Sequence, residues 1–343
     1  MSIRYIKHPG SIAGDRLSEK VLSQVRREFG AEVEPFALHR PVPELLAGVW
    51  MACRETLLAG DGGRDAKELV AAAVSTINRC PFCVDAHSIM LLESSGYDYP
   101  EALADTYLGR IAEWASSTLK PGSAILHSPP FSDTEAPAFI GTAVFFHYIN
   151  RMVTILLGTS PLPFSSGIPK QVSMRMAAWF FGGAIRLRKP QGTSLELLQE
   201  APLPDDLSWA KASLPIVGAF ARFTNAIEHA GVGSLSEEVR ASVSKSAQNW
   251  DSSNPDMNDG WYEDNIAHLQ GADKAAGRLA FLTAFAPYKV DEEVVRAFSE
   301  YFPGDDILIS ALAWSSFTAA RRIGSWLYMP HVLHLQFYAS PVL

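Results

Sequence analysis

The chain has 343 residues, which is enough for one large domain or for two of ordinary size. Its 29 basic and 37 acidic residues give a net charge of −8, and this argues against non-specific binding to nucleic acid, which needs a cationic surface. Apolar residues make up 48% of the chain, so it can bury a core and is not disordered, and its three cysteines are too few for a disulfide-stapled secreted scaffold.

Helical periodicity dominates the sequence, and alternating, strand-like runs are nearly absent. In chain order, the first half predicts helices over residues 44–59, 67–78, 84–93, 100–117 and 138–157. The second half predicts helices over residues 217–230, 237–248, 264–286 and 307–327. Gly60, Gly96 and Gly231 stand where helix C-caps are expected. We therefore predict an all-α fold.

The most apolar stretch, residues 139–157, carries His147, Asn150 and Arg151. An arginine in a bilayer is costly, and the N-terminus lacks the apolar stretch of a signal peptide. We therefore expect no membrane span and a cytoplasmic protein. The three polar side chains interrupt an apolar helix, so they need buried partners or a polar cavity. They either line a substrate pocket or form a buried ion pair or a subunit contact.

The chain matches itself at a shift of about 170 residues, which is the pattern of an internal repeat. The matching segments are 49–60 with 220–231, 67–74 with 237–244, 109–112 with 277–280, and Arg151 with Arg321. Four matches in the same order predict a duplicated α-helical domain. We place the first copy at residues 1–190 and the second at 205–343, with the boundary in the polar stretch 189–206.

One short segment combines four residue types that can carry chemistry. Residues 68–87 read ELVAAAVSTINRCPFCVDAH and contain Glu68, Cys80, Cys83 and His87. The proline after Cys80 suits the first turn of a helix, so the chain is expected to turn back sharply here and run antiparallel to the preceding helix. Cys83 and His87 are four residues apart and share one face of the second helix. The hairpin therefore brings both sulfurs, the imidazole and the carboxylate into one line.

These groups suit thiol chemistry. A helix N-terminus and a nearby imidazole both lower the pKa of a thiol and so favour the reactive thiolate. A carboxylate can orient the imidazole and accept its proton. Two cysteines at this spacing can close a disulfide once one of them is oxidised, which stops oxidation at a recoverable state.

Other interpretations of the same residues remain open at this point. Cys80, Cys83 and His87 could bind a metal, although zinc usually takes four ligands and Cys53 would have to complete the set. The cysteines could also be small buried hydrophobes, and His87 a core histidine. Glu68 could instead close a capping box with the aspartate three residues before it.

The segment 68–87 resembles the active-site signature of the AhpD-like (carboxymuconolactone decarboxylase) superfamily, whose AhpD branch comprises all-α alkylhydroperoxidases. The resemblance implies that Cys83 is the attacking thiol, that Cys80 is its disulfide partner, and that Glu68 and His87 form the proton relay. Family peroxidases often carry a histidine where this chain has Phe82, and that departure favours thiol–disulfide chemistry. In the second copy the matching positions of both cysteines and the histidine are Trp250, Ser253 and Met257, so we expect that copy to be inactive.

We therefore expect a thiol-dependent oxidoreductase that reduces a small peroxide or exchanges disulfides through Cys80 and Cys83. An external dithiol, such as a lipoyl domain, a thioredoxin-like protein or a small thiol, would reduce the enzyme. No bound cofactor is expected, because a glycine-rich phosphate loop is absent, and no metal. By analogy with the family, we expect a homo-oligomer. The alternatives are an acid–base enzyme, such as a decarboxylase, that uses His87 and Glu68, or a non-catalytic helical binding module.

Overall fold

The computed structural model describes residues 3–6, 15–157, 189–253 and 260–328. No β-strand forms among these residues, and their one β contact is an isolated bridge between Ala59 and Lys189. The prediction of an all-α fold is therefore confirmed.

The helices follow most of the predicted segments. Those of the first half are α1 (Arg16–Phe29), α2 (Glu34–Ala37), α3 (Pro43–Cys53), the π-helix η1 (Arg54–Leu58), α4 (Arg64–Ile77), α5 (Pro81–Ser95), α6 (Tyr99–Ala104), α7 (Thr106–Ser116), α8 (Ala124–His127) and α9 (Ala136–Leu156). Those of the second half are η2 (Leu195–Leu197), η3 (Asp205–Ala210), α11 (Leu214–Ser234), α12 (Glu237–Asn249), α13 (Gly260–Ile266), α14 (Gly271–Phe285), η4 (Pro287–Lys289), α15 (Glu292–Ser299) and α16 (Asp305–Leu327). The analysis of the sequence did not predict α1, α2, α8 or α15.

Two predicted helices are each broken in two. The segment 100–117 forms α6 and α7, because Asp105 caps the start of α7 by accepting hydrogen bonds from the N–H groups of Tyr107 and Leu108. The segment 264–286 is divided between α13 and α14, where Gly271 adopts a φ of +52°. That backbone conformation favours glycine and interrupts a regular helix.

Gly231 does not end a helix, so this part of the prediction is wrong. Helix α11 continues to Ser234, and Gly231 lies against the indole ring of Trp314 on α16. A Cβ at this position would approach Cδ1 of that ring to 2.2 Å. Glycine is needed at this position because α11 and α16 pack closely here and leave no room for a side chain. Gly96, in contrast, is the predicted C-cap of α5, with a φ of +79°.

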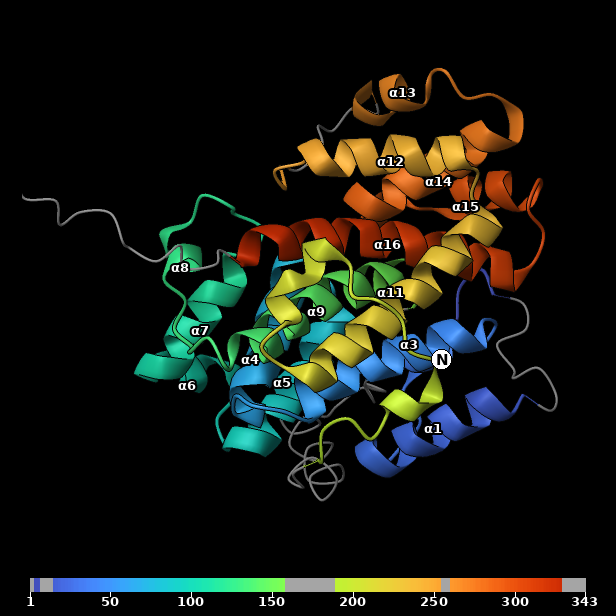
Figure 1. Cartoon of the computed structure of the whole chain (residues 1–343). Helices are drawn as coiled ribbons and strands as arrows, with labels where there is room; N and C mark the ends of the chain where they lie inside the picture. Colours follow the sequence, from blue (N-terminus) through green and yellow to red (C-terminus); the bar gives the residue numbers. More distant parts are fainter. Residues whose placement is uncertain (1–2, 7–14, 158–188, 254–259, 329–343) are drawn as a thin grey trace, which may run out of the picture.

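The two halves of the chain share one continuous core. Helices α9 and α16 pack against each other at its centre, and α11 packs on both α3 and α16. Figure 1 shows α12, α13, α14 and α15 on one side of α16, and α3, α4, α5 and α9 on the other. In the part of the chain that the structure describes, α9 is the one helix long and apolar enough to span a bilayer, but 94% of its most apolar window is buried inside the protein.

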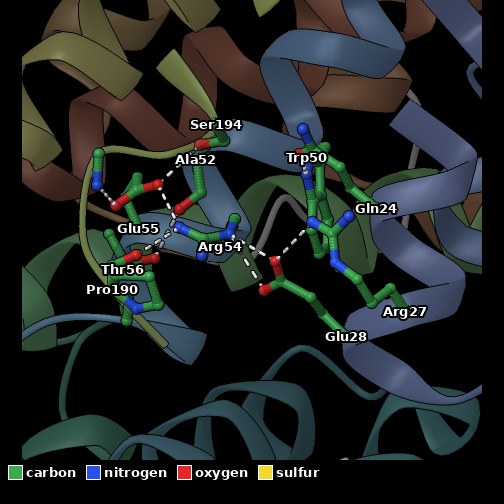
Figure 2. Close-up of polar contacts among 12 residues, drawn as sticks. Gln24, Arg27, Glu28, Trp50, Ala52, Arg54, Glu55, Thr56, Pro190 and Ser194 are labelled. Atoms are coloured by element: carbon green, nitrogen blue, oxygen red, sulfur yellow. Dashed lines mark hydrogen bonds and ion pairs between the residues drawn. The ribbon is translucent and has the colours of Figure 1, made fainter. Parts of the chain in front are cut away.

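A buried ion network fastens the segment after residue 189 to the first half (Figure 2). Arg54 Nε lies 3.0 Å from Glu28 Oε2 on α1, and Arg54 Nη1 lies 2.7 Å from Glu55 Oε1. Glu55 also accepts hydrogen bonds from the main-chain N–H of Gly192 and from the hydroxyl of Ser194, each at 2.7 Å. The charged side chains of this network are almost completely buried.

Candidate active site

The chain reverses between α4 and α5 as the sequence predicts. Asn78 ends α4, Arg79 takes a φ of +54°, and Cys80 is the N-cap of α5. Pro81 follows as the first residue of α5, where its missing N–H leaves no donor without a partner. The hairpin therefore places both cysteines at the start of α5, against the preceding helix.

The two sulfurs lie together at the N-terminus of α5. Cys80 Sγ and Cys83 Sγ are 2.9 Å apart and share a hydrogen bond, and both thiols are free and buried. This hydrogen bond lowers the pKa of Cys80, whereas burial raises the pKa of Cys83. Cys83 therefore needs a neighbouring base before it can become a thiolate.

The buried carboxylate of Glu68 contacts both His87 and Arg64. Its side chain is completely buried, with Oε2 2.6 Å from Nδ1 of His87 on α5 and Oε1 2.7 Å from Nε of Arg64 on α4. Burial alone would raise the pKa of Glu68, but the nearby Arg64 and His87 outweigh it and hold this pKa below its usual value. Glu68 is therefore an ionised carboxylate that orients the imidazole.

The capping-box interpretation of Glu68 is wrong. Helix α4 begins at Arg64 with Gly63 as its N-cap, and no side chain caps it. Glu68 lies in the second turn, beyond the position from which a side chain can reach back to the N-cap. The sequence suggested a later helix start than the structure has, and this shift of three residues decides between the two roles.

An apolar pocket leads to the thiol site. Both Cys83 and His87 line it, and the His87 ring meets the Phe146 ring edge to face, with centroids 4.5 Å apart. The other lining residues are Phe29, Val33, Pro35, Phe36, Cys53, Leu57, Phe82, Ala86, Met90, Phe145 and Ile149. Cys80 is not among the described residues that line the pocket. An apolar molecule in this pocket therefore meets Cys83 first.

Two of the three polar residues on α9 support the hairpin turn. His147 binds the side chain of Asn78 at 3.0 Å and the hydroxyl of Thr118 at 2.9 Å, and burial keeps its pKa well below the usual value, so the imidazole is neutral. Asn150 accepts a hydrogen bond from Asn78 Nδ2 at 2.9 Å and donates one to Ser75 Oγ at 3.1 Å. Asn150 also hydrogen-bonds the Cys83 thiol and favours its thiolate.

Arg151 contacts main-chain carbonyls rather than the pocket. Its Nε donates to the carbonyl of Ala284 on α14 at 2.9 Å, and its Nη1 donates to the carbonyl of His147 at 2.5 Å. Burial lowers the pKa of Arg151 to about 10. His147, Asn150 and Arg151 are not in the lining of the pocket beside Cys83 among the described residues, so their role in binding substrate stays a prediction.

The analysis of the sequence missed two residues of the site, Arg64 and Asn78. Arg64 precedes Glu68 by four residues, and this spacing could have indicated the ion pair. Asn78 carries no comparable signal, because its partners on α9 are far away in the sequence. No group of three His, Cys, Asp or Glu side chains arranged to hold a metal ion was found in the described part of the chain.

Comparisons with known proteins agree with this geometry. The model of the carboxymuconolactone decarboxylase family matches residues 43–96, from the start of α3 to the C-cap of α5, and this range contains all four motif residues. The chain is also 36% identical over 338 residues to an alkyl hydroperoxide reductase of Mycobacterium tuberculosis (strain H37Rv). The match covers 95% of this chain and 96% of the relative, so it extends far beyond the motif.

Proposed function

Because the chain belongs to the carboxymuconolactone decarboxylase family, as the motif predicted, we propose that it is a thiol-dependent peroxide reductase that uses Cys83 and Cys80. One observation carries this proposal: Cys83 and His87 line the same pocket, and His87 is held by an ionised carboxylate, Glu68. A nucleophile, a base and a group that orients the base are the parts that such chemistry needs.

In the first step, Nε2 of His87 takes the proton of Cys83, and the thiolate attacks the outer oxygen of the hydroperoxide. The O–O bond breaks, the alkoxide leaves with the proton from His87, and Cys83 becomes a sulfenic acid. Burial disfavours the Cys83 thiolate, so a base next to this sulfur is required. The hydrogen bond from Asn150 assists by stabilising the thiolate.

In the second step, Cys80 attacks the sulfenic acid of Cys83, and water leaves with one proton. Cys80 suits this task, because the shared hydrogen bond lowers its pKa and its sulfur lies 2.9 Å from its target. The products are an alcohol, water and a Cys80–Cys83 disulfide. An external dithiol, from a lipoyl or thioredoxin-like protein or a small thiol, then reduces the disulfide by exchange.

The pocket favours an organic hydroperoxide over hydrogen peroxide. Its walls are aromatic and aliphatic, and Phe82 stands where related peroxidases often carry a histidine. An alkyl or aryl group gains free energy by leaving water for such a surface, whereas hydrogen peroxide has no apolar part to bury. The name of the Mycobacterium tuberculosis relative agrees with this substrate class.

The test is to treat the fully reduced protein with one equivalent of cumene hydroperoxide and to map its peptides by mass spectrometry. We expect a loss of two hydrogens on the peptide that contains Cys80 and Cys83, with one equivalent of alcohol formed. If that peptide keeps its two thiols while peroxide is consumed, the proposed cycle is wrong.

Cys53 provides an internal control and a separate prediction. It also lines the pocket, but burial raises its pKa far above the usual value, so it is a thiol and not a thiolate near neutral pH. We expect iodoacetamide at pH 7.5 to leave Cys53 unmodified in the folded protein and to modify it in urea. Rapid labelling of Cys53 in the folded state would contradict this prediction.

We also propose that the chain is a tandem of two AhpD-like copies, 1–190 and 205–343, of which the first is active. The packing of α9 on α16 is consistent with this, because these helices carry Arg151 and Arg321, which match in the repeat. In the second copy, Trp250 packs on Phe285 at 5.3 Å where the first has Cys80, and Met257 lies outside the described residues. A cytoplasmic location and a homo-oligomer remain predictions.

A further inference from the structure

Arg64 lies beside the proton relay and has no role in the cycle described so far. It precedes Glu68 by one helical turn, and its Nη2 and Nε atoms lie 2.6 and 2.7 Å from the same oxygen, Oε1. These distances are typical of charge-assisted hydrogen bonds. The Arg64 side chain is 17% exposed, whereas Glu68 is completely buried. Arg64 is therefore the outer end of a chain that runs through Glu68 to His87.

The two oxygens of Glu68 have different partners. Oε1 binds Arg64, and Oε2 lies 2.6 Å from Nδ1 of His87. A buried carboxylate without a cation tends to take up a proton, because burial disfavours its charged form. With Arg64 in place, the charge of Glu68 is balanced without a second proton on His87. Glu68 can then hold the imidazole ring in place through Oε2.

We propose that Arg64 is a positioning residue of the thiol site: it keeps Glu68 ionised, so that Oε2 holds His87 through its Nδ1–H and leaves Nε2 free to accept the proton of Cys83. The role of Cys83 in this statement rests on the proposed function. The positions of the protons on Glu68 and His87 do not depend on the proposed function, and they can be measured separately.

Removal of the Arg64 charge has the same consequence by two routes. In the first, Glu68 takes up a proton and, as a neutral acid, donates a hydrogen bond to Nδ1 of His87, so that the single imidazole proton lies on Nε2. In the second, His87 becomes an imidazolium, which carries a proton on both nitrogens. Either way Nε2 is occupied near neutral pH and cannot take the thiol proton.

The other titratable groups near Glu68 do not replace Arg64. Lys67 Nζ donates to the carbonyl of Ala59 at 2.7 Å, and burial, together with repulsion from Arg64, lowers the pKa of Lys67 to about 7. Burial keeps Cys53 protonated, so it carries no charge that could balance Glu68. Arg64 and His87 are the described side chains that hydrogen-bond the carboxylate.

The experiment measures the rate at which iodoacetamide alkylates Cys83, located by peptide mapping, in the fully reduced protein between about pH 6 and about pH 10.5. In Arg64→Gln we expect the midpoint of this profile to move up by about one to two pH units, which lowers the rate at neutral pH by about 10- to 100-fold. The rate should return to within about twofold of wild type at the alkaline end. Arg64→Lys keeps the positive charge, so the midpoint of its profile should stay close to that of wild type. Arg110→Gln, which removes an exposed arginine from α7, should leave it unchanged.

The nitrogen-15 shifts of His87 in the wild-type protein provide a second measurement, which does not require the variant to fold. We expect a protonated Nδ1 and an unprotonated Nε2 at neutral pH. An Nε2–H tautomer in wild type, or an unmoved midpoint in Arg64→Gln, would overturn the inference. Peroxide turnover is recorded in parallel. If the midpoint shifts in Arg64→Gln but the wild-type protein does not turn over peroxide, the proposed function alone is refuted. If wild type turns over peroxide but the midpoint does not move in Arg64→Gln, the role of Arg64 alone is refuted.

Discussion

A Cys83→Ser variant is expected to lose peroxide turnover with a dithiol reductant by about three orders of magnitude or more. A serine hydroxyl fills nearly the same volume, so the fold is kept, but it does not ionise under these conditions and is a poor nucleophile toward oxygen. Of the two motif cysteines, Cys83 lines the pocket, and Cys80 has no such access among the described residues. The loss is measured as kcat/KM for cumene hydroperoxide.

Two further variants make this result specific. Cys80→Ser should still form one equivalent of alcohol and then stop, because the sulfenic acid of Cys83 has lost the thiol that resolves it. Cys53→Ala removes a pocket thiol that stays protonated and should change turnover by no more than about twofold. An acid–base enzyme that uses only His87 and Glu68 would instead keep its rate in Cys80→Ser. Full peroxide turnover by Cys83→Ser would end the peroxidase proposal.

An Arg54→Met variant is expected to lower the free energy of unfolding by about 3–5 kcal/mol. Arg54 is almost completely buried and lies 3.0 Å from Glu28 and 2.7 Å from Glu55, which are buried as well (Figure 2). Methionine fills the space but leaves two buried carboxylates without their cation. Most of the loss comes from these uncompensated charges rather than from the net value of the ion pairs.

The matched control is Arg27→Met, because Arg27 contacts the same Glu28 carboxylate from the surface. Its Nη2 lies 3.5 Å from Glu28 Oε1, and its side chain is 66% exposed. Exposed ion pairs contribute about 0–1 kcal/mol, so this variant should change the unfolding free energy by less than about 1 kcal/mol. Urea titrations of both variants give the comparison. Equal effects of the two substitutions would show that burial of the network does not determine its contribution.

The same network connects stability with the site. Arg54 lies between Cys53 and Leu57 on the chain, and Glu28 precedes Phe29, and all three of these neighbours line the pocket beside Cys83. The π-helix that carries Arg54 also carries Glu55, which holds the segment after residue 189. The pocket wall is therefore fixed by a charged network that contains none of the proposed catalytic residues.

Local patterns in the sequence were enough to predict the fold class and the helical hairpin that carries the motif. Apolar periodicity depends on residues three and four apart, and it predicted helices that the structure contains, from α3 to α16. The hairpin followed from equally local signals, because a proline within a helix is tolerated in its first turn and Pro81 therefore marks a helix start. The spacing of Cys83 and His87 then put them on one helix face. These inferences needed no knowledge of how distant segments meet.

Only the tertiary structure decided what surrounds those groups. Glu68 was compatible with a helix cap or with a proton relay, and its contacts with His87 and Arg64 decided in favour of an orienting carboxylate. The sequence suggested that Gly231 ends a helix, but in the structure it lies within α11, against the indole of Trp314. The walls of the pocket come from α1, α2, α3, η1, α5 and α9, and the turn is held by side chains about 70 residues away. The physical reason is that burial and ion pairing depend on distance in space, whereas sequence pattern reports only neighbours along the chain.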